Sequence, residues 1–148
     1  MIVPDTNLLV FAYDTTSPFH VAAKKWWEAV LSGDGPVGIP WIVVLAFTRL
    51  MTHPTICADP LTTEQVRRRI GQWIGQPHVR VLCPSPGTMD KFFDLLKGGG
   101  LGGNLTTDAL IAAHTIENAA TLFSNDRDFD RFPGLKWTNP LPARPRNY

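Results

Sequence analysis

The segment TTDALIAAHTIENAATLFSNDRDF, residues 106–129, decides the fold of this chain. Residues 107–118 are rich in strong helix formers, and residues 121–124, with Leu122 and Phe123 at their centre, predict a short buried strand directly after that helix. The preceding chain repeats this order, with apolar strands of about four residues between longer stretches at helical spacing. The alternation predicts an α/β fold with a short, mostly parallel central sheet. Because the strands are apolar throughout, we expect helices on both faces of the sheet.

The same reasoning places the other elements. We expect strands at residues 2–4, 37–39, 79–82, 121–124 and 136–138. We expect helices at residues 7–12 (capped by Thr6 or Asn7), 20–30, 41–51, 63–73 (opened by a capping box of Thr62 and Gln65), 88–97 (ended by the glycine run 98–100) and 107–118. Together they form one domain over residues 1–141, followed by an extended tail at 142–148.

Composition restricts the class of protein. The chain has 148 residues, of which 44% are hydrophobic, enough for the core of one domain, and its net charge of +1 does not by itself indicate a nucleic-acid binder. Cys57 and Cys83 lack the clustered spacing of a zinc site, and we expect them to be buried reduced thiols. There is no apolar stretch of roughly 20 residues for a membrane span and no cationic leader at the start. We therefore expect a cytoplasmic protein.

Three aspartates are expected at one edge of the sheet. Asp5 directly follows the first strand, and Asp126 follows the late strand at 121–124. Asp108 lies in the first turn of the helix that precedes this strand. A crossover helix runs antiparallel to the strands, so its first turn lies at their carboxyl ends, where open α/β sheets bind ligands. The three carboxylates should therefore meet in one crevice.

Such a cluster favours a divalent cation. Three neighbouring carboxylates repel one another, and without a cation at least one should take up a proton. Oxygen ligands suit Mg²⁺ or Mn²⁺, and such an ion can polarise a phosphodiester and acidify a bound water. Each acid also has a purely local explanation: Asp5 as a helix cap, Asp108 as a partner of the helix dipole, and Asp126 as a turn residue.

Three segments resemble PIN domains. IVPDTNLL at 2–9 resembles the family's opening, NLTTDALIAA at 104–113 is similar to the helix that bears the third acid, and ATLFSNDRDF at 120–129 is similar to the fourth-acid segment. Their order, spacing and total length fit the VapC toxins of bacterial toxin–antitoxin pairs. The resemblance runs from Ile2 to about Leu141.

The resemblance implies a three-layer α/β/α fold and an endoribonuclease that depends on Mg²⁺ or Mn²⁺. It also implies a homodimer and a VapB-type antitoxin that occludes the active site. By this resemblance, the metal-site acids are Asp5, Asp108 and Asp126. The residues that support the site are Asn7, Ser124 and Asp128. If the chain is extended after Asp126, Asp128 lies about 6.6 Å further along it.

The sequence departs from the family at one position. Many PIN domains carry a glutamate in the helix after the second strand, and the expected acid falls on Val44. This leaves open a catalytically weak or inactive PIN-fold module that binds RNA or a partner. An aspartyl-phosphate hydrolase with Asp5 as nucleophile is a further alternative, although Asn7 stands where its second aspartate belongs. Arg49, on the same apolar helix as Val44, either pairs with a carboxylate or contacts the substrate.

Overall fold

The computed structural model describes residues 1–99 and 102–143, so most of the predicted tail (residues 144–148), the last residue of the glycine run (Gly100) and Leu101 lie outside it. In the described part, five strands form one sheet in the order β3-β2-β1-β4-β5. All of their pairings are parallel. The strands are β1 (Ile2–Pro4), β2 (Val37–Pro40), β3 (Val79–Leu82), β4 (Thr121–Phe123) and β5 (Trp137–Thr138). The predicted parallel sheet is confirmed.

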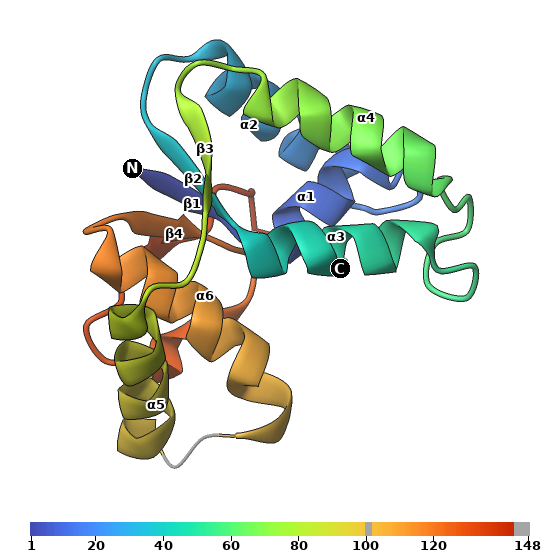
Figure 1. The fold of residues 1–148 in the computed structure, drawn as a ribbon. Coiled ribbons are helices and arrows are strands. Elements are labelled where there is room, and N and C mark those ends of the chain that lie inside the picture. Colours follow the sequence, from blue (N-terminus) through green and yellow to red (C-terminus); the bar gives the residue numbers. More distant parts are fainter. Residues whose placement is uncertain (100–101, 144–148) are drawn as a thin grey trace.

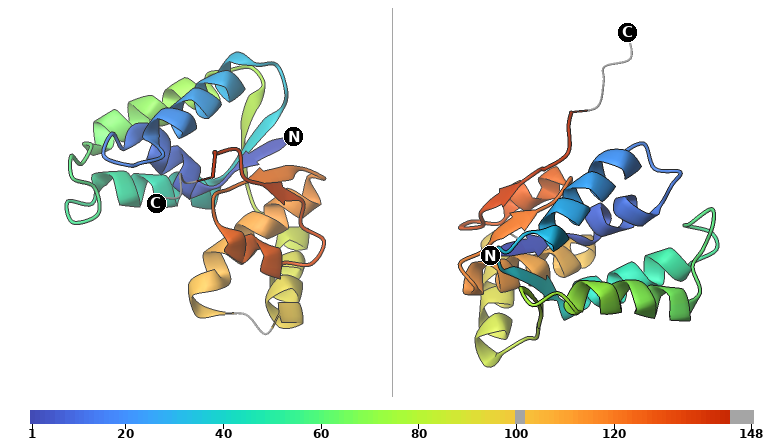
Figure 2. Two further views of the ribbon diagram at one scale, coloured as in Figure 1. Left: turned by 180° about the vertical axis from the view of Figure 1, so that it is seen from behind. Right: turned by 90° about the horizontal axis from the view of Figure 1, so that it is seen from above.

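Helices cover both faces of this sheet (Figures 1 and 2), which confirms the three-layer α/β/α architecture. The helices are α1 (Thr6–Tyr13), α2 (His20–Ser32), α3 (Trp41–Thr52), α4 (Thr63–Ile74), α5 (Pro86–Gly99) and α6 (Thr106–Glu117), with short 3₁₀ turns η1 (Gly103–Leu105) and η2 (Arg127–Arg131). Figure 1 shows α5 and α6 together on one side of the sheet, and α1, α2 and α4 grouped on the other.

An aromatic cluster joins the helices on the α1–α4 side. The ring of Trp73 on α4 lies 4.9 Å from that of Phe47 on α3, 5.5 Å from Trp27 on α2 and 5.7 Å from Tyr13 on α1, centroid to centroid. The Trp73 indole Nε1 also donates a hydrogen bond of 2.8 Å to the Tyr13 hydroxyl. Because these rings are large and in edge-on or tilted contact, one side chain fixes how four helices pack.

The start of α5 differs from the prediction. The helix begins at Pro86 rather than at Thr88, as suits a proline, which favours the first helical position. Glu117 at the end of α6 holds this start, since its carboxylate accepts hydrogen bonds from Thr88 Oγ1 at 2.6 Å and from Ser85 Oγ at 3.3 Å. The capping box before α4 is present as predicted, with both reciprocal bonds between Thr62 and Gln65.

Two expectations about burial were wrong. Strand β3 is not apolar throughout, because it is an edge strand that exposes Arg80, whose guanidinium donates to Asn118 Oδ1 at 3.2 Å. Cys57 is buried, but Cys83, just after β3, is exposed. A bilayer-spanning helix is not found among the residues that the structure describes.

The aromatic cluster gives a test of the fold. We expect Trp73→Ala to lower the free energy of unfolding by about 3–5 kcal/mol, because it removes a fully buried ring and leaves a cavity. Trp41→Ala is the matched control: Trp41 is 58% exposed, and its loss should change stability by less than about 1 kcal/mol. Urea denaturation measures both, and equal effects would contradict the assigned role of the cluster.

Candidate functional site

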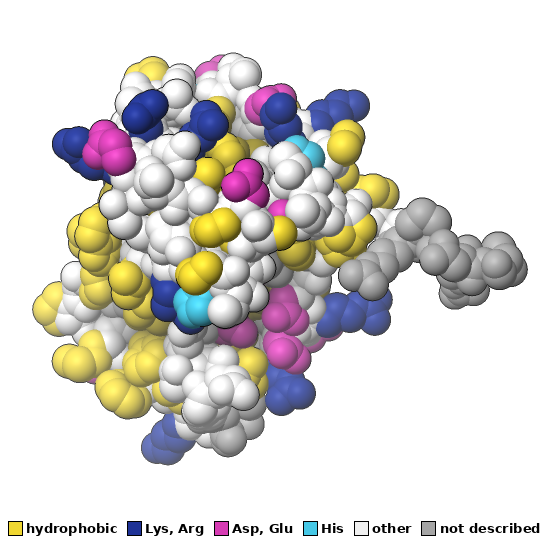
Figure 3. Space-filling model, turned by 90° about the vertical axis from the view of Figure 1, so that its right-hand side faces the viewer, with side chains coloured by type: hydrophobic (Ala, Val, Ile, Leu, Met, Phe, Trp, Pro, Cys, Tyr) yellow, Lys and Arg dark blue, Asp and Glu magenta, His cyan; other side chains and the backbone are white. Residues whose placement is uncertain are grey.

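The three aspartates singled out from the sequence line a common hollow of about 380 Å³. Asp5 follows β1, Asp126 follows β4 and Asp108 lies in the first turn of α6, so the parallel sheet brings them to one edge. Asn7 from α1 and Arg49 from α3 line the same hollow. On the side of the molecule to which α1 and α3 extend, Figure 3 shows acidic side chains gathered near the middle and basic side chains around them.

Asp5 is fixed by two hydrogen bonds. Its Oδ1 accepts from the backbone N–H of Thr6 at 2.7 Å, and its Oδ2 accepts from Ser124 Oγ at 2.6 Å. Asp5 is therefore the N-cap of α1, and the expectation that Thr6 or Asn7 caps this helix was wrong. Asp5 has both roles that the sequence allowed: it caps α1, and it also borders the hollow, with only 6% of the residue exposed.

Ser124 connects the ends of the two central strands. Its hydroxyl donates to Asp5 and accepts from the backbone N–H of Asp126 at 3.0 Å. Asp126 in turn caps η2, because its Oδ1 accepts from the N–H of Asp128 at 2.8 Å. The extended chain on which the 6.6 Å spacing of Asp128 depends is not found, because η2 is a 3₁₀ turn that advances only about 2 Å per residue. Asp128 is not among the described residues that line the hollow and pairs with Arg131 at 3.6 Å, but its charge raises the pKa of Asp108.

Burial and the charges of neighbouring acids oppose the ionisation of Asp5 and Asp108. Burial raises the pKa of Asp5 to about 7, although the Ser124 hydrogen bond opposes the shift, and the charges of Asp108 and Asp126 add to it. Burial, followed by the charges of Asp126 and Asp128, raises the pKa of Asp108 to about 6. A divalent cation in the hollow would remove this electrostatic penalty.

The donor set fits an oxygen-ligated cation. Besides the carboxylates, Thr6 and Asn7 border the hollow, and Thr6 Oγ1 and Asn7 Oδ1 are buried oxygens without a hydrogen-bond partner in the described structure. An unpaired buried polar atom costs about 1–3 kcal/mol, so these atoms favour a bound water or ion. Among residues 1–99 and 102–143, no three acid, histidine or cysteine side chains stand ready to hold one ion directly. Mg²⁺ typically takes one or two carboxylates and keeps several waters, which is compatible with this arrangement.

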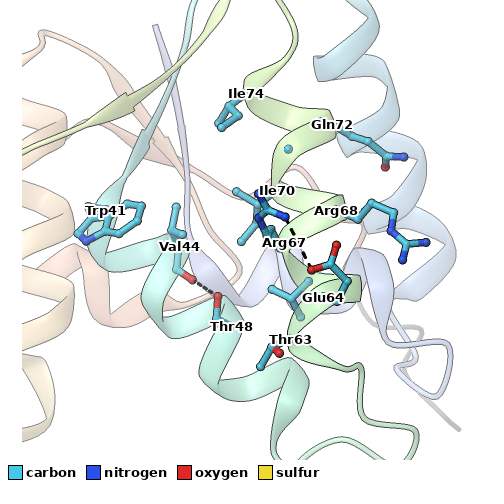
Figure 4. Close-up of a pocket in the computed structure, with 12 residues that line it drawn as sticks. Trp41, Val44, Thr48, Thr63, Glu64, Arg67, Arg68, Ile70, Gln72 and Ile74 are labelled. Carbon is cyan, nitrogen blue, oxygen red and sulfur yellow. Dashed lines mark hydrogen bonds and ion pairs between the residues drawn. The ribbon is translucent and has the colours of Figure 1, made fainter.

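Helix α3 contributes a basic side chain, Arg49, to the hollow and no acidic one. The residues of α3 that line it are Ala46, Arg49 and Leu50. Val44, the position assigned to the missing glutamate, is buried on another face of α3. Figure 4 shows it lining a separate pocket between α3 and α4 with Trp41 and Thr48. An acid at position 44 would therefore point away from the three aspartates.

Two other acids do not belong to this site. Glu117 is bonded to Thr88 at the start of α5, and Glu28 on α2 pairs with Lys24 at 3.8 Å. In the sequence, Arg49 stands out as a charged residue on an apolar helix, but the sequence alone leaves its role open. The helix is apolar on nearly every side, so its sequence did not indicate which face borders the hollow.

The raised pKa of Asp5 predicts a pH-dependent stability change. The folded state holds this proton more tightly than the unfolded state, so ionisation of Asp5 destabilises the cation-free protein as pH rises from about 4 to about 7. The difference in unfolding free energy between Asp5→Asn and wild type should therefore shift in favour of the variant by about 2–3 kcal/mol between pH 5 and pH 8. Urea denaturation in EDTA measures this difference.

The control is Asp90→Asn, which removes an exposed carboxylate from α5. It should show no such dependence on pH. If Asp5→Asn and Asp90→Asn gave the same profile, the burial penalty assigned to Asp5 would be refuted.

Comparison with known proteins identifies the family. The PIN domain family model matches residues 2–135. Ribonuclease VapC33 of Mycobacterium tuberculosis is 38% identical over 141 residues, which cover 95% of this chain and 99% of that protein.

Solved structures agree in fold. VapBC2 from Rickettsia felis, bound to a DNA fragment from their promoter, aligns with a TM-score of 0.67 at 23% identity over 94% of this chain and 98% of that one. A toxin–antitoxin complex from Klebsiella pneumoniae aligns with a TM-score of 0.68 at 17% identity over 97% of this chain and 100% of that one. With 134 residues matched by one model (2 through 135) and a VapC ribonuclease at more than a third identity, the chain belongs to the PIN domain family.

Proposed function

We propose that this protein is the toxin of a toxin–antitoxin pair and an endoribonuclease that hydrolyses RNA phosphodiesters with Mg²⁺ or Mn²⁺. The observation that carries the proposal is the single hollow lined by Asp5, Asp108 and Asp126, two of which have raised pKa values. The relationship to VapC33, a protein named as a ribonuclease, supports the reaction class. The proposed metal-site acids are these three aspartates, supported by Asn7, Ser124 and Asp128.

The residues of the hollow have distinct proposed roles. A bound ion would supply a polarised phosphoryl oxygen and a more acidic water. Ser124 holds the Asp5 carboxylate in one orientation, and the Thr6 N–H fixes its second oxygen, so this ligand needs no reorganisation on binding. Apolar side chains on the wall, among them Phe11 and Ile111, limit the access of water and strengthen the electrostatic interactions inside.

The proposed partners are an RNA substrate, a VapB-type antitoxin and a second copy of the chain, all acting in the cytoplasm. The aligned Klebsiella pneumoniae structure is a toxin–antitoxin complex, which supports the antitoxin. Apolar side chains more than half exposed on α3 and α5 offer surface for protein association, namely Trp41, Leu45, Met89 and Phe93. The second candidate is an inactive RNA- or partner-binding module, favoured only by the missing fourth acid.

The proposal predicts RNA cleavage that requires the cation and the acids. Purified protein should cleave single-stranded RNA in Mg²⁺, lose this activity in EDTA and regain it when Mg²⁺ is restored. Asp5→Asn and Asp108→Asn should each lower kcat/KM at least about 100-fold, because each removes charge that holds the ion in the transition state. Gel analysis of a labelled RNA measures the rates.

Asp90→Asn serves again as the charge-matched control and should cleave like wild type. Cleavage that survives Asp5→Asn would contradict the proposed site. RNA binding without cleavage across Mg²⁺ and Mn²⁺ titrations would favour the inactive module.

A further inference from the structure

Arg49 is the one basic residue among the described residues that line the acid hollow. It lies in the last turn of α3, three residues after Ala46 and one before Leu50, and all three border the hollow. Positions separated by three and four residues share one face of a helix. The backbone of α3 therefore places Arg49 on the face that borders the site.

The described structure does not use Arg49 as a partner for the acids. The three ion pairs among the described residues join Lys24 to Glu28, Arg67 to Glu64, and Arg131 to Asp128. None of them includes Arg49, although Asp5, Asp108 and Asp126 border the same hollow. Asp5 is instead bonded to Ser124 and Thr6, and Asp126 to the N–H of Asp128. Of the two roles that the sequence left open for Arg49, pairing with a carboxylate is thus the one that the geometry disfavours.

The chemistry of the hollow calls for a positive group of this kind. A phosphodiester that enters it meets three carboxylates, which repel its charge, and one ion does not balance all of them. A guanidinium stays charged at any working pH and offers a planar fork of donors that matches two phosphate oxygens. Negative charge grows on those oxygens as water attacks the phosphorus, so the same contact strengthens in the transition state.

We propose that Arg49 binds the scissile phosphate of the RNA, and that it supplies from α3 a positive charge facing the three aspartates of the hollow. This inference rests on the proposed ribonuclease function. It makes Arg49 a catalytic residue that contacts substrate and that has no role in holding the metal.

The test compares Arg49→Ala and Arg49→Lys with Arg68→Ala. Arg68 is an exposed arginine on α4 that takes part in none of the ion pairs of the described residues, so its substitution changes net charge equally. With a labelled single-stranded RNA at saturating Mg²⁺, we expect Arg49→Ala to lower kcat/KM about 100-fold, as does the loss of one transition-state donor. Arg49→Lys should recover part of that loss, and Arg68→Ala should stay within about threefold of wild type. Thermal melting of all three variants should match wild type.

A second measurement does not depend on cleavage. In EDTA, the slope of log K for RNA binding against log salt concentration should fall by about 0.7–1 for Arg49→Ala, since one phosphate contact is lost. The half-saturating Mg²⁺ concentration should not rise. Unchanged kcat/KM and an unchanged salt slope would overturn the inference while the ribonuclease function stands. A variant that regains full activity at higher or lower Mg²⁺ would also overturn it, because Arg49 would then act on the ion.

If wild type does not cleave RNA at all, the proposed function fails. The salt dependence of RNA binding then tests only whether Arg49 contacts a phosphate. A smaller slope for Arg49→Ala supports that contact, and an unchanged slope rejects it.

Discussion

The hydroxyl of Ser124 lies between two acids whose positions in the sequence are more than a hundred residues apart. It donates to Asp5 at the end of β1 and accepts from the N–H of Asp126 after β4, so it joins the ends of the two paired central strands. The register of β1 and β4, in which Pro4 pairs with Phe123, sets both strand ends at the same level. The hollow, its electrostatics and the position of η2 all depend on this alignment.

The site has an unfavourable electrostatic energy before any ligand binds. The fold buries Asp5, places Asp108 and Asp126 near it, and leaves the oxygens of Thr6 and Asn7 unpaired. Away from the hollow, buried polar side chains are bonded at the contacts that hold the helices, as between Trp73 and Tyr13 and between Thr88 and Glu117. The packed helices hold the repelling carboxylates around one hollow, and this repulsion is the physical reason for the proposed cation site.

The sequence was sufficient to predict the sheet, the helices and the meeting of the three aspartates, because short apolar strands alternating with helices permit few topologies. The sequence was insufficient where several neighbouring side chains could cap the same helix, or where several faces of a helix were equally apolar. Thr6, Asn7 and Asp5 can each cap a helix, and the sequence does not indicate that α1 begins at Thr6 with Asp5 accepting the Thr6 N–H. The chain around Asp128 curls because Asp126 caps it, which spacing alone does not reveal. The role of α3 was obscured because its apolar residues surround it on nearly all sides.

Helix α3 is a wall with a different compartment on each side. Arg49 and Ala46 border the acids, whereas Val44 and Thr48 border the pocket against α4. The wall is about 10–12 Å thick, one helix diameter, which exceeds the screening length of about 8 Å at physiological salt. Salt therefore largely screens the acids from a charged group bound beside α4, and helix α3 insulates the two compartments from each other electrostatically.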